Sequence, residues 1–138
     1  MTWGLPSFDP FLRRMERALD VMSRRQQLTA ANIANIDTPG YHTVDIDFDR
    51  ALQRAVEEAG GGVEPARTRP GHLAPASSPS ERPREVEGLM ERIDGNNVNL
   101  DREMLALAQV RLRYDAATAL LRIKLRQLRS VISEGRIG

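Results

Sequence analysis

The sequence predicts an all-α protein whose long N- and C-terminal helices pack as a coiled-coil-like pair, with a flexible Pro/Gly-rich segment between them. Two observations support this prediction. Apolar residues recur every three or four positions toward both ends of the chain, and five of the eight prolines lie within residues 59–88. We therefore divide the 138 residues into an N-terminal arm (1–58), a linker (59–88) and a C-terminal arm (89–138).

The N-terminal arm is expected to form a helix over about residues 9–36, where apolar side chains fall at helical spacing. Asp9 suits the N-cap of this helix and Pro10 suits its first turn. Because a proline disfavours helical geometry at the residue before it, the helix should end shortly before Pro39. Gly40 then completes a turn.

The C-terminal arm has the most regular pattern in the chain. From Leu100 to Ile132, mostly apolar residues step alternately by four and by three, which is the repeat of a coiled coil. Arg111 and Thr118 interrupt the repeat, and Asn99 is placed to cap the helix. The predicted seam between the two helices consists of Met15, Leu19, Met22, Leu100, Met104, Leu107, Leu121, Leu125, Leu128 and Ile132.

The linker is a poor core-former. It contains the run Gly60-Gly61-Gly62 and no aromatic residue, so it cannot bury enough apolar surface to offset the entropy lost on ordering. The C-terminal arm is also apolar nearly all round over residues 116–121, which predicts contacts on more than one face. We expect the chain to complete its core by assembling with other subunits.

Composition excludes several classes of function. The chain has no cysteine, so it forms no disulfide or thiolate metal site, and His42 and His72 offer little for a histidine site. The alternating Asp45, Asp47 and Asp49 lack the Gly and Glu of a calcium loop and are expected on a solvated, extended segment. No phosphate-binding loop or catalytic triad appears. We therefore expect no enzymatic activity, cofactor, metal or small-molecule substrate.

Charge and hydropathy add two further expectations. The net charge of +1 argues against strongly steered binding of a polyanion. The chain has no run of the ~18–20 apolar residues that span a bilayer. Its N-terminus lacks the charged start and apolar run of a secretory signal. By default this pattern indicates a cytoplasmic protein, although it leaves open export without a cleaved signal.

Two short motifs stand out at the inner ends of the two arms. The first, ANIANIDTPGY (residues 31–41), places Asn32 and Asn35 on one helix face, where their side chains can bond a returning loop or a neighbouring chain. The second, GNNVNLDREM (residues 95–104), combines a turn with the cap of the long helix. A helix end, a turn and a cap, without further function, would also account for both motifs.

Together the two motifs resemble those of the bacterial flagellar rod, hook and hook-associated proteins, and the second is similar to the form found in rod proteins. The resemblance covers about residues 8–52 and 94–132 and departs slightly at Asp37. It implies a structural subunit of the proximal rod of the flagellar basal body. This rod is the periplasmic drive shaft between the MS-ring and export gate and the distal rod, and it is needed for motility.

The resemblance also implies partners and an export route. The partners are further copies of the chain, other rod proteins, a FliE-like adaptor, the MS-ring and the export gate, and export uses the flagellar type III system without a cleaved signal. The residues expected to form the turn and polar clasp between subunits are Asn32, Asn35, Thr38, Pro39, Gly40, Tyr41, Gly95, Asn96, Asn97 and Asn99.

An alternative function is a helical adaptor or a weak nucleic-acid-binding coiled coil. Residues 99–138 carry eight basic and four acidic side chains, a net charge of +4. This excess is modest, and only Tyr114 interleaves an aromatic ring with the arginines. We therefore expect no nucleic-acid partner.

Overall fold

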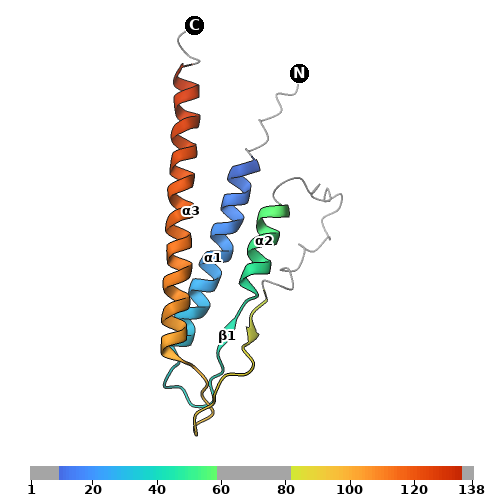
Figure 1. The fold of residues 1–138 in the computed structure, drawn as a ribbon, viewed down its shortest axis with the longest axis vertical. Coiled ribbons are helices and arrows are strands. Elements are labelled where there is room, and N and C mark those ends of the chain that lie inside the picture. The colour runs from blue at the N-terminus through green and yellow to red at the C-terminus, as the bar shows by residue number, and fades with distance from the viewer. Residues whose placement is uncertain (1–9, 59–81, 135–138) are drawn as a thin grey trace, which may run out of the picture.

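The computed structural model describes residues 10–58 and 82–134, most of which are helical. Helices α1 (Pro10–Ala34), α2 (Phe48–Glu58) and α3 (Leu100–Glu134) lie side by side, with α1 and α3 running in opposite directions (Figure 1). The predicted all-α fold, with long N- and C-terminal helices packed together, is confirmed. Strands β1 (Val44–Asp45) and β2 (Arg84–Glu85) form one short antiparallel pair.

The last part of the segment expected as a linker lies within the described residues. Residues 59–81 and the expected N-cap Asp9 lie outside the described residues. Residues 82–88, however, belong to the fold, because β2 pairs with β1 and the amide of Val86 donates to the carbonyl oxygen of Thr43 at 2.9 Å. Backbone hydrogen bonds to β1 and Thr43 hold this part of the expected linker in the fold.

Helix α2 is a correction to the extended segment expected around residues 45–49. The chain is extended through β1 and becomes helical at Phe48, where the amide of Ala51 donates to the carbonyl oxygen of Asp47 at 2.8 Å. Phe48, Ala51 and Ala55 share one face of α2 and are buried, so packing decides the structure here. The alternating aspartates lie where the extended chain passes into this helix.

The core lies between the helices and is built mainly from small side chains. Its buried members are Ala18, Val21, Met22, Ile46, Phe48, Ala51, Ala55, Val110 and Ala117. Small residues let helices approach closely, but they remove little apolar surface from water. The core of one chain is therefore thin for three helices of this length.

Helix α3 meets α1 with a different stripe from the predicted seam. The members of that seam on α3 that stand exposed are Leu100 (46%), Met104 (52%), Leu125 (49%) and Ile132 (71%). Val110 and Ala117 are buried instead, whereas Leu107, Leu121 and Leu128 are half-buried. On α1, Met22 is buried and Met15 and Leu19 pack partly against the core.

The two interruptions in the repeat explain this rotation of α3. Along the predicted stripe, burial would fall on the charged Arg111 and the polar Thr118, and burying an unpaired charge is costly. Shifting the buried face by one residue brings Val110 and Ala117 inward instead. Because α3 is apolar on several faces, the spacing alone did not distinguish the two stripes.

Within the described residues, no helix is both long and apolar enough to cross a membrane. No group of three or more His, Asp or Glu side chains in that part of the chain could hold a metal ion.

Candidate functional site

The two motifs meet at the loop end of the molecule, where α1 ends and α3 begins (Figure 1). The amide of Gly40 donates to the carbonyl oxygen of Asp94 at 2.8 Å, and the amide of Asn97 donates to that of Tyr41 at 3.2 Å. Around these backbone contacts lies a group of polar side chains that we call the asparagine clasp: Asn32, Tyr41, Thr43, Asn96, Asn97 and Glu103.

Asn96 ties the second motif to the end of α1. Its side chain is fully buried, and its Nδ2 donates to the carbonyl oxygens of Asn35 and Thr38, each at 2.9 Å. Its Oδ1 accepts from the amide of Val98 at 2.8 Å. The carbonyl oxygens of Asn35 and Thr38 also accept from the backbone amides of Thr38 and Tyr41, at 3.0 and 3.2 Å. The Asn96 amide therefore adds a second hydrogen bond to each carbonyl and joins the second motif to the turn that follows α1.

Asn97 holds the segment that leads into β1. Its Oδ1 accepts from the amide of Thr43 at 2.6 Å, and the hydroxyl of Thr43 donates to the carbonyl oxygen of Asn97 at 3.3 Å. Both residues are buried. This reciprocal pair joins segments more than 50 residues apart in the sequence and fixes the register between the two motifs.

Asn32 connects α1, the loop and α3 through one side chain. Its Nδ2 donates to the carbonyl oxygen of Val44 and to Oε2 of Glu103, both at 2.9 Å. Its Oδ1 accepts from the amide of Val44 at 3.1 Å and from the hydroxyl of Tyr41 at 3.0 Å. The amide therefore uses two donor and two acceptor positions, which is its full capacity.

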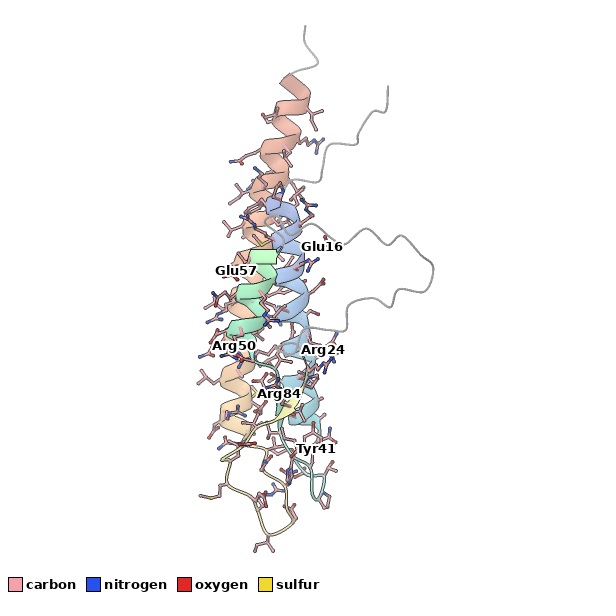
Figure 2. The ribbon with its side chains drawn as sticks, turned by 90° about the vertical axis from the view of Figure 1, so that its right-hand side faces the viewer. Glu16, Arg24, Tyr41, Arg50, Glu57 and Arg84 are labelled. Carbon is pink, nitrogen blue, oxygen red and sulfur yellow. The ribbon has the colours of Figure 1, made fainter. Side chains whose placement is uncertain are left out.

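Glu103 is a carboxylate at a buried position, and its charge is compensated. Its other oxygen, Oε1, accepts from Nη1 of Arg102 at 2.8 Å. A buried charge with a hydrogen-bonded partner avoids most of the desolvation cost of an isolated one. Partial burial raises the pKa of Tyr41, and the nearby charge of Glu103 raises it further. Tyr41 lies at the loop end of the molecule, below Arg84 on β2 (Figure 2).

The remaining motif residues shape the turns around the clasp. Nδ2 of Asn35 donates to the carbonyl oxygen of Ala31 at 2.8 Å, and the hydroxyl of Thr38 donates to Oδ1 of Asn35 at 3.1 Å. Oδ1 of Asn99 accepts from the amide of Arg102 at 3.0 Å, which makes Asn99 the N-cap of α3.

Gly40 and Gly95 have positive φ angles of 71° and 77°, which side chains rarely tolerate. A Cβ on Gly95 would also lie 3.4 Å from the Cα of Gly40. The two turns therefore lie in van der Waals contact, and the positive φ is what favours glycine at position 95.

The expected clasp between subunits thus has partners inside one chain for its buried members. Asn32, Asn96 and Asn97 bond other parts of the same chain. Thr38 and Pro39 are exposed, so a role in contacts between subunits stays a prediction for the outer surface of the turn. The arrangement ties the end of α1 to the start of α3.

Sequence reasoning missed Thr43 and Glu103. Thr43 lies two residues after the first motif and Glu103 lies within the second, but neither was among the predicted site residues. Their role is visible only in the fold, which places Glu103 beside Asn32 and Thr43 beside Asn97.

The three aspartates that resembled a cation loop each face an arginine instead. Asp45 accepts from Arg25 at 3.1 Å, Asp47 lies 3.7 Å from Arg50, and Asp49 lies 3.4 Å from Arg113. The guanidinium of Arg25 also lies 4.6 Å from the centroid of the Phe48 ring. The Arg25 contacts join α1 to β1 and to α2, and the Arg113–Asp49 pair joins α3 to α2.

Helix α3 also exposes large apolar side chains to solvent. They form a second surface, outside the clasp, that is relevant to function. One exposed stripe follows steps of three and four along a single face, roughly opposite the side that meets α1. We call it the open stripe of α3: Leu105, Ala108, Leu112, Ala116, Ala119 and Ile123.

Comparison with known proteins identifies the family. Residues 12–42, which include the first motif, match the family model described as flagella basal body rod protein. The flagellar basal body rod protein FlgB of Yersinia ruckeri is 33% identical over 139 residues, covering 95% of this chain and 99% of the relative. FlgB of Salmonella typhimurium is 35% identical over 140 residues, with the same coverage. FlgB of Bacillus subtilis is 28% identical over 130 residues, covering 94% and 98%. The chain belongs to the flagellar basal body rod protein family.

Proposed function

We propose that the protein is a structural subunit of the proximal rod of the flagellar basal body, and that it completes its core by packing against neighbouring subunits. Membership of the rod family gives a structural role in the basal body and assembly with other rod components. The family is one of structural proteins, so the asparagine clasp serves architecture rather than catalysis.

The observation that carries this proposal is the open stripe of α3. Leu105 is 60% exposed, Leu112 is 72% exposed and Ile123 is 44% exposed. Apolar patches of this extent on a single chain mark surfaces that are covered in an assembly. Burying a fully exposed side chain of this size contributes about 1.5–3 kcal/mol. Covering the exposed parts of these three side chains would therefore favour packing of helices from adjacent subunits.

The finer part of the proposal concerns partners and route. We infer that the subunit joins a FliE-like adaptor, the MS-ring and the export gate to the rest of the rod, and that it is exported by the flagellar type III system to the periplasm without a cleaved signal. A thin core of small side chains supports this route, because a weakly stable monomer unfolds readily for threading through a narrow channel.

A deletion strain tests the proposal. Loss of the gene should abolish motility and stop the basal body at the membrane ring, as seen by electron microscopy of isolated basal bodies. Complementation with the wild-type gene should restore both. Intact flagella in the deletion strain would overturn the proposal.

A variant on the open stripe separates assembly from folding. Leu112→Asp places a charge on a side chain that already stands in water, so the circular dichroism spectrum and urea midpoint of the purified chain should stay unchanged. The same variant should fail to restore motility, whereas Leu112→Met should restore it. Full motility with Leu112→Asp would show that the stripe faces solvent in the rod.

A further inference from the structure

The loop of residues 86–95, which we call the tip, presents two large apolar side chains fully to solvent. Met90 is 92% exposed and Ile93 is 109% exposed. Single exposed apolar residues are ordinary on protein surfaces, but two within one short loop form a surface that favours burial. The tip lies at the loop end of the elongated molecule, beyond the asparagine clasp (Figure 1).

The tip is held in place by hydrogen bonds. The amide of Arg92 donates to the carbonyl oxygen of Asn96, and the amide of Gly95 donates to that of Arg92, both at 2.9 Å. The guanidinium of Arg92 lies 2.7 Å from the carboxylate of Asp94. Because the loop is already ordered in the free chain, binding through Met90 and Ile93 would lose little further entropy.

The charge of the tip is acidic. Residues 86–95 contain Glu87, Glu91 and Asp94 but one basic residue, Arg92, which is engaged by Asp94. Glu91 lies 3.7 Å from Nε2 of His42. A loop that exposes apolar side chains among acidic residues fits a partner that is apolar and basic.

The chain itself carries a surface of that kind on the C-terminal part of α3. Residues 120–133 contain four basic residues and no acidic residue. Apolar side chains stand exposed between them, with Leu125 at 49%, Val131 at 68% and Ile132 at 71%. This part of α3 lies at the end of the molecule opposite the tip (Figure 1), so the two surfaces of one chain cannot meet.

We propose that the tip docks on the apolar, basic end of a long helix in an adjoining rod subunit, and that residues 120–133 form this chain's own copy of the receiving surface. The contact is heterologous, because it joins different surfaces of the two subunits, and such contacts build open helical assemblies instead of closed pairs. This inference rests on the proposed function, since it needs the chain to stand in a rod.

Site-specific photocrosslinking in flagellated cells tests the inference. The full chain carries a benzophenone amino acid at position 93, and the crosslinked peptide from purified basal bodies is identified by mass spectrometry. The expected peptide is a helical segment with exposed apolar residues, at least two Lys or Arg and no Asp or Glu, either residues 120–133 of a second copy or the corresponding helix of another rod protein. The same probe at Val56, which is exposed on α2, should give a different peptide.

Two results would overturn the inference in different ways. A crosslink to an acidic or non-helical segment, or no crosslink in fully assembled basal bodies, refutes the docking and leaves the rod function standing. Absence of the chain from basal bodies refutes the rod function itself. Either outcome is read from the same preparation.

A paired substitution adds a second readout. Met90→Ser with Ile93→Ser should leave the urea midpoint of the purified chain unchanged, because both side chains already lie in water. In cells it should lower the number of completed rods about tenfold or more, since exposed anchors of this kind dominate binding free energy. The control, Met90→Leu with Ile93→Val, keeps the apolar surface and should assemble normally. Normal assembly of the serine variant would contradict the docking.

Discussion

Replacing Asn96 with alanine tests the asparagine clasp directly. The substitution removes the two bonds that Nδ2 donates to the carbonyl oxygens of Asn35 and Thr38, and the bond that Oδ1 accepts from the amide of Val98. Each such bond contributes about 0.5–1.5 kcal/mol net, and loss of the bond to the buried amide of Val98 adds a desolvation cost. We expect the free energy of unfolding to fall by about 2–4 kcal/mol.

Equilibrium unfolding in urea, followed by circular dichroism, measures this loss. With a slope of about 1–2 kcal/mol per molar urea for a domain of this size, the midpoint should fall by about 1–3 M. Asn99→Ala is the matched control: it removes one exposed N-cap bond, to the amide of Arg102, and should cost about 1 kcal/mol. A variant already unfolded in buffer would show a loss at least as large as predicted. A cost for Asn96→Ala within about 0.5 kcal/mol of wild type would refute the assignment of Asn96 as the side chain that ties the two motifs together.

Three further predictions concern the turn, the tyrosine and the helix seam. Gly95→Ala forces a Cβ onto a positive φ and should cost about 1–2 kcal/mol in the same urea assay; an unchanged midpoint would contradict the left-handed backbone at this position. The raised pKa of Tyr41 gives a stability contribution that is fully present below the pKa of the unfolded chain and is lost as pH rises through the folded pKa. The difference in absorbance at 295 nm between wild type and Tyr41→Phe should therefore titrate at higher pH in the folded than in the urea-unfolded chain, and a lower folded midpoint would refute it. Val110→Ala should destabilise the chain by about 1–2 kcal/mol, because Val110 is buried, and Met104→Ala by less than about 0.5 kcal/mol, because Met104 is exposed. A larger loss for Met104→Ala would show that the seam predicted from the sequence is the buried one.

Periodicity predicted the helices but not their rotation. The spacing of apolar residues located α1 and α3, because one apolar face is enough to define a helix. It did not choose between the stripe through Met104 and the stripe through Val110, since both repeat at the same interval. The cost of burying the charge of Arg111 favours the stripe through Val110. The sequence shows Arg111 as an interruption of the repeat, but the spacing alone does not give the free energy of burying it.

Local spacing predicted the motif residues without their partners. The turn at Pro39 and Gly40 and the cap at Asn99 follow from short-range rules, and the structure has both. The bond of Asn32 to Glu103 and the bonds of Asn96 to Asn35 and Thr38 join residues some 60 to 70 positions apart in the sequence. A single sequence has no signal for such pairs, so Thr43 and Glu103 appeared only with the fold.

The sequence around residues 45–55 was also ambiguous between a helix and an extended chain. Phe48, Ala51 and Ala55 fit one helical face, but the alternating Asp45, Asp47 and Asp49 favoured an extended chain. Packing against α1 resolved the conflict in favour of α2. Tertiary contacts overrode local preference here, as they often do in short segments.

Chemical labelling of a single cysteine on the open stripe tests the central claim that neighbouring subunits cover this face of α3. The chain has no cysteine, so Leu112→Cys creates one reactive site on a side chain that is 72% exposed in the single chain. The account predicts rapid reaction with a maleimide in the purified chain and strong protection at the same position in isolated basal bodies. Equal labelling in the two states would contradict it.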